Sequence, residues 1–72
     1  MHMGNDEKVL KNLGTRLKKA RETARMTQLD VAKAADINVN YYAQIERGEI
    51  NTSYDKLQRI AKALKLKSID LT

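Results

Sequence analysis

Residues 27–48, TQLDVAKAADINVNYYAQIERG, decide the fold, because they hold two short helical patterns on either side of a tight turn. Thr27, followed three residues later by Asp30, is typical of a capping box at a helix N-terminus. Asp36 stands where this first helix ends, and Asp tolerates a left-handed backbone better than most residues other than glycine. The first half of the stretch therefore predicts a helix that begins after Thr27 and stops at Asp36.

The second half of the stretch predicts another short helix, which Asn38 caps and Gly48 ends. At about 100° per residue, the side chains of this helix fall on two faces. One face is bulky and mostly apolar, with Tyr42 assigned to the core and Tyr41 at the boundary between the faces. The opposite face carries small or hydrogen-bonding side chains, which are those of Val39, Asn40, Ala43, Gln44 and Arg47.

Two helices that meet at such a corner form a helix-turn-helix, the motif whose second helix enters the major groove of DNA. Asn and Gln side chains offer a donor and an acceptor together, which matches the edge of adenine, and small apolar side chains contact the thymine methyl. The alternative is a solvated polar helix face, which the paired helices, caps and flanking charges disfavour. The residues expected to read bases are Val39, Asn40, Ala43 and Gln44.

Helical periodicity continues upstream of this stretch, and no segment alternates polar and apolar residues as a strand would. A helix is expected from Asn5 or Asp6 to about residues 24–26. Gly14 inside it costs about 1 kcal/mol relative to Ala, and the close approach of another helix would explain its presence. The apolar stripe of this helix consists of Leu10, Leu13, Leu17, Ala20 and Ala24.

Inward-facing residues continue through the rest of the chain. In the helix after Thr27 they are Leu29, Val31, Ala32 and Ala35, and Ile37 fills the corner that follows. Ser53 caps a further helix whose inward residues are Leu57, Ile60, Ala61 and Leu64. A last helical turn is expected at residues 69–71, capped by Ser68. The fold class predicted is all-α, a compact five-helix bundle with a central helix-turn-helix at residues 27–48.

Composition excludes several other classes of protein. The 72 residues predict one domain, residues 5–72, with residues 1–4 assigned to a tag remnant or disordered start. Cysteine is absent, and no apolar run approaches a membrane span or a signal peptide, so we expect a soluble cytoplasmic protein. The single histidine, His2, lies in the tag remnant, and the carboxylates are scattered. We therefore expect no enzyme, no metal site, no cofactor and no small-molecule ligand.

The net charge of +5 is distributed unevenly along the chain. Seven basic residues against Glu22 give residues 8–27 a charge of +6, residues 51–72 carry +3, and the segment between carries −2. Such a chain suggests a polyanionic partner, here double-stranded DNA, whose phosphates bind at helix N-termini and to cations. The residues expected on the DNA backbone are Gln28, Lys33, Asn38, Tyr41, Arg47, Asn51, Thr52, Ser53 and Lys56. For the caps among them a purely structural role is the alternative.

The sequence resembles the lambda-repressor-like (Cro-type or Xre-type) helix-turn-helix family over residues 13–71. The segments that carry the resemblance are LGTRLKKAR, MTQLDVAKAADI, YYAQIERG and LQRIAKAL, in that order. It implies the same base-reading and phosphate-binding positions, and it implies an ion pair between Arg21 and Glu46. The loop after ERG is most similar to that of restriction–modification controller proteins, in which an Asn is followed by Ser or Thr. Three features depart from the family pattern: Asp36 in place of the turn glycine, a loop without proline, and Val39 among usually polar readers.

The resemblance and the residues together predict a sequence-specific transcriptional regulator that binds a near-palindromic operator as a homodimer. Its two reading helices would lie about 34–36 Å apart, one turn of DNA. The residues expected at the dimer surface are Leu64, Leu66, Ile69 and Leu71, and the alternative is that all four complete the core of one copy.

Other functions of the same fold stay open from the sequence. The main alternative is an antitoxin or adaptor that binds another protein. In an activator, the acidic Asp30, Asp36 and Glu49 could contact RNA polymerase. A controller protein, a phage repressor and a stand-alone regulator all fit the same residues.

Overall fold

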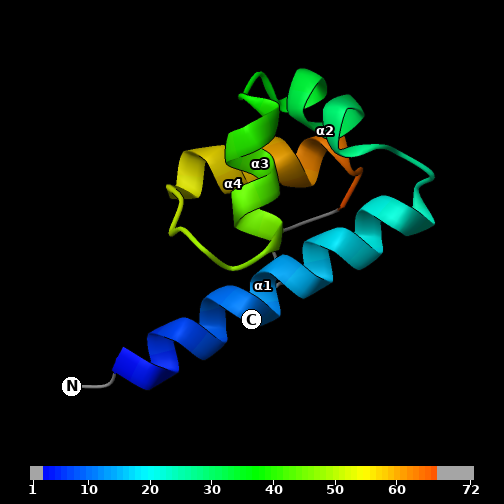
Figure 1. The fold of residues 1–72 in the computed structure, drawn as a ribbon. Helices are drawn as coiled ribbons and strands as arrows, with labels where there is room; N and C mark the ends of the chain where they lie inside the picture. The colour runs from blue at the N-terminus through cyan, green and yellow to red at the C-terminus, as the bar shows by residue number, and fades with distance from the viewer. Residues whose placement is uncertain (1–2, 67–72) are drawn as a thin grey trace.

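The computed structural model describes the backbone of residues 3–66 of the 72-residue chain, with side chains from residue 7 onward. The helices are α1 (Met3–Thr23), α2 (Gln28–Ala35), α3 (Val39–Glu46) and α4 (Tyr54–Ala63). Helices α2, α3 and α4 pack together, and α1 runs as a long rod along one side of them (Figure 1). Within residues 3–66 the fold is all-α, as predicted.

The described part of the chain contains four helices, whereas the sequence predicted five in the whole chain. The fifth, at residues 69–71, lies outside the described residues. Helix α1 begins at Met3, before the predicted start at Asn5 or Asp6. Cap preferences of about 1 kcal/mol are too small to define a start against a sequence that continues the helix.

Helix α1 ends at Thr23 through a left-handed residue that is not glycine. Arg25 has φ 60°, and the N–H of Met26 donates to the carbonyl of Arg21 at 3.1 Å, which closes the last turn. Ala24 is therefore exposed in the turn, and its predicted place in the apolar stripe is wrong. A glycine would have marked this end in the sequence, but none is present.

The predicted caps of the three shorter helices are confirmed. The Thr27 hydroxyl accepts from the Asp30 N–H at 3.0 Å, and the Asp30 carboxylate accepts from the Thr27 N–H at 2.9 Å. Asp36 ends α2 at φ 59° and ψ 50°, in the left-handed region. Asn38 and Ser53 cap α3 and α4. These local devices fix where each helix begins and so set the angle of the helix-turn-helix.

One apolar core holds the four helices together. Its largest fully buried side chains are Leu17, Val31, Tyr42, Ile45 and Ile60, contributed by all four helices. Leu29, by contrast, is 50% exposed, so its predicted inward position is wrong. Helix α2 buries a narrow stripe of Val31, Ala32 and Ala35, and Leu29 lies roughly 115° around the helix from the centre of that stripe.

Candidate nucleic-acid interface

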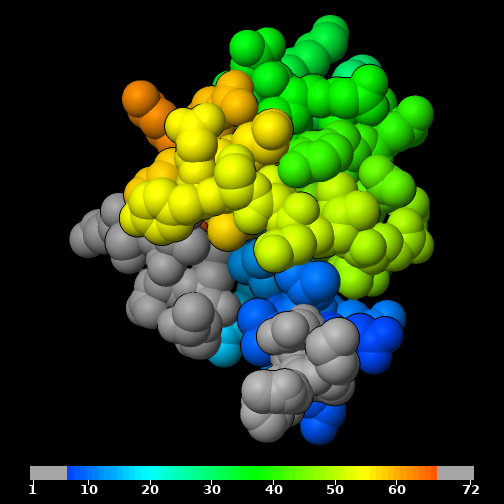
Figure 2. All heavy atoms as spheres, turned by 90° about the vertical axis from the view of Figure 1, so that its left-hand side faces the viewer, coloured from blue at the N-terminus to red at the C-terminus, as the bar shows by residue number. Residues whose placement is uncertain are grey.

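The face of α3 predicted to read bases lies at the surface, in a conformation that its cap fixes. The Asn38 side chain accepts from the N–H groups of Asn40 and Tyr41 at 2.7 and 3.2 Å. Asn40 is exposed and Gln44 is partly exposed, while Val39 packs partly against the core. Figure 2 shows α3, the loop after it and α4 together on one face of the molecule. The structure therefore leaves the two amide side chains available for base edges, with Ala43 partly exposed between them.

Three of the residues predicted to contact the DNA backbone lie together beside this face. The hydroxyl of Tyr41 and that of Thr52 are 2.8 Å apart, which joins α3 to the loop before α4. The Lys56 ammonium lies 5.4 Å from the centre of the Tyr41 ring, within the range of a cation–π contact. The Ser53 hydroxyl accepts from the N–H of Lys56 at 3.1 Å, which fixes the first turn of α4 beneath that lysine.

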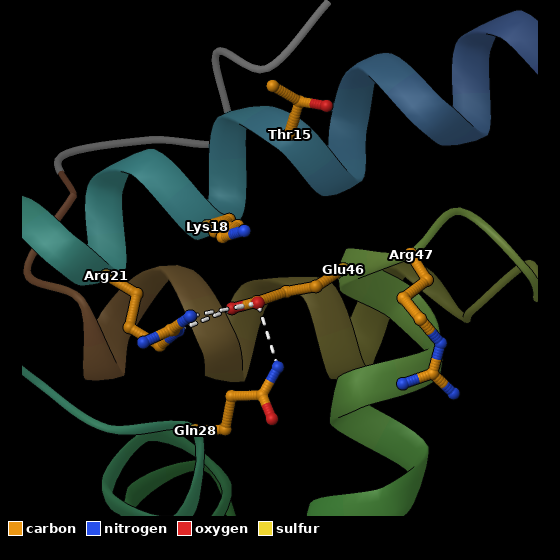
Figure 3. Close-up of a pocket in the computed structure, with 6 residues that line it drawn as sticks. All are labelled: Thr15, Lys18, Arg21, Gln28, Glu46 and Arg47. Carbon is orange, nitrogen blue, oxygen red and sulfur yellow. Dashed lines mark hydrogen bonds and ion pairs between the residues drawn. The ribbon is translucent and has the colours of Figure 1, made fainter.

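The ion pair between Arg21 and Glu46 that the resemblance implies is present and nearly buried (Figure 3). Arg21 donates through Nε to Glu46 Oε2 at 2.6 Å and through Nη2 to Oε1 at 3.1 Å. Its third nitrogen, Nη1, donates to the carbonyl of Met26 at 3.0 Å. Gln28, the first residue of α2, donates from Nε2 to Glu46 Oε1 at 3.0 Å. One carboxylate on α3 thus connects that helix to both α1 and α2.

These contacts determine the ionisation of the cluster. Burial raises the pKa of Glu46, but the hydrogen bonds from Arg21 and Gln28 and the nearby Tyr42 hydroxyl outweigh it and leave the pKa lowered. The hydrogen bond from Arg21 to Glu46 likewise raises the pKa of Arg21. Burial raises the pKa of Tyr42, whose hydroxyl is enclosed beside Glu46 without a well-formed hydrogen bond. Arg21 and Glu46 are therefore both charged at neutral pH.

A second contact between α1 and α3 lies two helical turns away from the ion pair, at Gly14. A Cβ atom added to Gly14 would lie 2.2 Å from the carbonyl oxygen of Glu46 and 2.6 Å from that of Ile45. The close approach expected of this glycine is confirmed. The C-terminal end of α3 therefore rests directly on the backbone of α1.

A polar pocket of about 500 Å³ opens between α1, α2 and the end of α3 (Figure 3). Its lining residues are Thr15, Lys18, Arg21, Gln28, Glu46 and Arg47. Two of them, Gln28 and Arg47, were predicted on the DNA backbone, whereas Lys18 and Thr15 were not singled out in the sequence. Arg47 forms a two-bond ion pair with Glu49 at 2.8 and 3.0 Å on the surface. Lys33 on α2 is exposed, and it belongs neither to the group of Tyr41, Thr52 and Lys56 nor to the lining of this pocket.

Neither a metal site nor a membrane span is found among the described residues. No group of three or more His, Asp or Glu side chains there could hold a metal ion. No described helix is both long and apolar enough to cross a membrane.

Comparison with known proteins places the chain in a family. The profile of the helix-turn-helix family matches residues 17–71, which is more than half of the chain. The chain belongs to the helix-turn-helix family. The immunity repressor protein of Bacillus phage phi105 is 36% identical over 52 residues, 72% of this chain and 36% of that protein. This helix-turn-helix chain thus spans about a third of the length of that relative.

A solved structure shows the same arrangement of helices. The restriction–modification controller protein C.AhdI from Aeromonas hydrophila superposes with a TM-score of 0.79 at 28% sequence identity. The superposition covers 81% of this helix-turn-helix protein and 88% of that chain. The predicted membership of the lambda-repressor-like group and the similarity to controller proteins are confirmed.

The helix-turn-helix structure describes two of the four apolar residues predicted at a dimer surface, Leu64 and Leu66. Leu64 is 5% exposed and belongs to the core, and Leu66 is partly buried against it. For these two residues the structure therefore shows a role in the core of one copy. Ile69 and Leu71 lie outside the described residues.

The buried carboxylate makes the stability of the helix-turn-helix fold depend on pH. A carboxyl whose folded pKa lies below its unfolded value, near 4.3 for Glu, stabilises the fold above that value and loses this effect as the pH falls. We expect the melting temperature to be nearly constant from pH 7 to 5 and to fall below about pH 4.5. Thermal melts across this range should show a shallower acid limb for Glu46→Gln than for wild type, and parallel limbs would contradict the assignment.

Proposed function

We propose that this helix-turn-helix protein is a sequence-specific DNA-binding transcriptional regulator, which binds a near-palindromic operator as a homodimer with α3 in the major groove. The observation that carries the proposal is the surface face of α3, which presents the neutral amide side chains of Asn40 and Gln44 from a helix whose first turn the Asn38 side chain caps through the backbone N–H groups of Asn40 and Tyr41. Asn and Gln side chains bind the adenine edge with two hydrogen bonds. A solvated helix face would not need the rigid attachment that Glu46 provides.

The distribution of charge supports the same role. The four residues predicted to read bases are neutral, while the net positive charge lies in residues 8–27 and 51–72 on either side of them. Cations of this kind contribute affinity for phosphates without reading sequence, and their effect weakens with salt. The repressor and the controller protein that this chain resembles are regulators by name, which favours this function over catalysis. A regulator of this kind acts on DNA in the cytoplasm.

Selection of bound sites from a pool of random duplex DNA tests the proposal. A recovered motif with two A·T-containing half-sites, about one helical turn apart, is the expected result. Sedimentation of the protein with that duplex would then measure two copies per site. Recovery of no preferred sequence, with equal binding to random duplexes, would count against specific regulation.

Substitutions on α3 and α4 should have different effects on binding. Asn40→Ala and Gln44→Ala should each cost about 1–3 kcal/mol on the selected site and relax specificity at one or two base pairs. Lys56→Ala should weaken binding to all duplexes alike and reduce the slope of log K against log salt by about 0.9. Fluorescence anisotropy on selected and scrambled duplexes measures both. Equal losses on the two duplexes for Gln44→Ala would refute its role as a reader.

A protein-binding role is the second candidate, and the exposure of Leu29 favours it. Leu29 is 50% exposed beside the exposed carboxylate of Asp30, a pairing suited to contact with a protein. RNA polymerase in an activator, or a toxin if the protein is an antitoxin, would be such a partner. Leu29→Gln should leave DNA binding unchanged and abolish activation of a reporter gene carrying the selected site. Unchanged activation would rule out an activating contact of Leu29 with RNA polymerase.

A further inference from the structure

Tyr41 contacts two residues, Thr52 and Lys56, that were each expected to bind a DNA phosphate independently. Its hydroxyl lies 2.8 Å from the Thr52 hydroxyl, and its ring lies under the Lys56 ammonium at 5.4 Å. Tyr41, Thr52 and Lys56 are all partly buried, so the three side chains pack on one another. The tyrosine therefore links the reading helix α3 to the loop and first turn of α4.

The positive charge of Lys56 is available to bind a polyanion. Two carboxylates in the adjoining sequence pair with arginines: Glu49 with Arg47 at 2.8 Å, and Asp55, the residue before Lys56, with Arg59 at 3.4 Å. The Lys56 ammonium instead lies over the Tyr41 ring. A ring holds an ammonium group more weakly than a carboxylate does and leaves its charge uncompensated. Lys56 is thus oriented without being neutralised.

The hydroxyl pair has a similar effect on Thr52. Either hydroxyl can donate in this contact, and when Tyr41 donates, the Thr52 hydrogen stays free for an acceptor such as a phosphate oxygen. A lysine or threonine that is already oriented loses less conformational freedom on binding, which increases affinity. In that arrangement the Tyr41 hydroxyl has no hydrogen left to donate to a phosphate.

We propose that Tyr41 is a positioning residue, which acts through Lys56 and Thr52 so that these two, and not the tyrosine, bind the DNA backbone beside α3. The inference rests on the proposed DNA-binding function. It replaces the expectation that Tyr41 contacts a phosphate directly. It also means that binding of the DNA backbone by Lys56 and Thr52 depends on the position of α3, which carries Tyr41.

Variants at Tyr41 separate positioning from direct contact. Tyr41→Phe keeps the ring under Lys56 and should weaken binding less than Tyr41→Leu, which should lose about two- to fivefold more, the value of an exposed cation–π contact. In the Tyr41→Leu background, Lys56→Ala should cost less than in wild type. Lys62→Ala, which removes an equal charge from the exposed side of the same helix, is the control and should give the same loss in both backgrounds.

A second readout needs no DNA. In the free protein, the ring current of Tyr41 should shift the Lys56 side-chain proton resonances upfield relative to those of Lys62. Tyr41→Phe should retain this shift and Tyr41→Leu should abolish it, with circular dichroism melts confirming that both variants fold.

Each outcome decides the matter. Equal losses for Tyr41→Phe and Tyr41→Leu, with Lys56→Ala additive to both, would mean direct contact by the hydroxyl and would overturn the positioning role. Absence of the ring-current shift in wild type would also overturn it. If the wild-type protein binds no duplex at all, the proposed function fails as well. That result differs from additive losses for Lys56→Ala and Tyr41→Leu in a protein that binds DNA, which would overturn only the positioning role.

Discussion

Replacing Gly14 by alanine is expected to lower the free energy of unfolding by about 2 kcal/mol or more. The added Cβ would lie 2.2 Å from the carbonyl oxygen of Glu46, and no rotamer change can relieve a contact with backbone. Such overpacking costs typically 1–3 kcal/mol and occasionally more, and three backbone atoms within 2.7 Å place this contact at or above the upper end of that range. After the roughly 1 kcal/mol that alanine gains over glycine in a helix is subtracted, a net loss of about 2 kcal/mol or more remains. Helix α1 would have to move away from α3.

Thermal melting measures this prediction directly. For a domain of this size a loss of 2 kcal/mol corresponds to roughly 8–16 °C in melting temperature. The matched control is Asn12→Ala on the exposed side of α1, where better helix propensity should raise stability by a few tenths of a kcal/mol. If Gly14→Ala stabilised the protein as much as this control, the close approach of α1 to α3 would be absent in solution.

Breaking the ion pair between Arg21 and Glu46 is expected to have a larger effect. The Arg21 side chain is 13% exposed and that of Glu46 is 3% exposed, so removal of one partner leaves an uncompensated charge at a largely buried position. A buried pair broken in this way costs about 3–5 kcal/mol. A 72-residue domain is stable by only about 4–11 kcal/mol, so Arg21→Met should lose a large part of its free energy of unfolding and melt far below the wild-type protein.

Charge reversal distinguishes a specific pair from a general loss of packing. Arg21→Glu and Glu46→Arg should each destabilise strongly, because each places two like charges in contact. The double swap should recover part of the loss, with a coupling energy of about 1–3 kcal/mol measured by thermal or urea unfolding. Recovery will be incomplete, because Gln28 also donates to the Glu46 carboxylate. Additive losses in the double variant would show that the two residues do not interact.

Both predictions concern the same end of α3. Positions 14 and 21 lie seven residues apart on α1, so both positions face the same neighbour. Gly14 meets the backbone of Glu46, and Arg21 meets its carboxylate. Since α3 is the proposed reading helix, variants at either position should also weaken DNA binding, in proportion to the population that is folded.

Local features of the sequence were sufficient for most of the helices. Thr27 with Asp30, Asn38 and Ser53 act on the few residues next to them, so their capping roles needed no knowledge of the rest of the fold. The left-handed conformation of Asp36 followed in the same way. The predicted end of α1 was less accurate, because Arg25 adopts a left-handed conformation with φ 60° that its residue type does not indicate.

Packing between helices was predictable only where a residue type implied it. Gly14 indicated a close neighbour, although not which one, and periodicity identified Leu17 and Ile60 as core. Leu29 was misplaced because periodicity cannot say how wide a stripe its helix buries. That width depends on the neighbouring helices, which leave Leu29 half exposed.

The sequence by itself determined the all-α class and the caps of the helix-turn-helix, because each depends on residues within about one or two turns of helix. It also determined that the residues proposed to read bases are neutral. Only the tertiary structure decided that Tyr41, Thr52 and Lys56 meet, and that Gln28 shares the Glu46 carboxylate with Arg21. These contacts join residues 11–25 positions apart. They exist because burial of the common apolar core fixes the angles between helices, and no local preference encodes those angles.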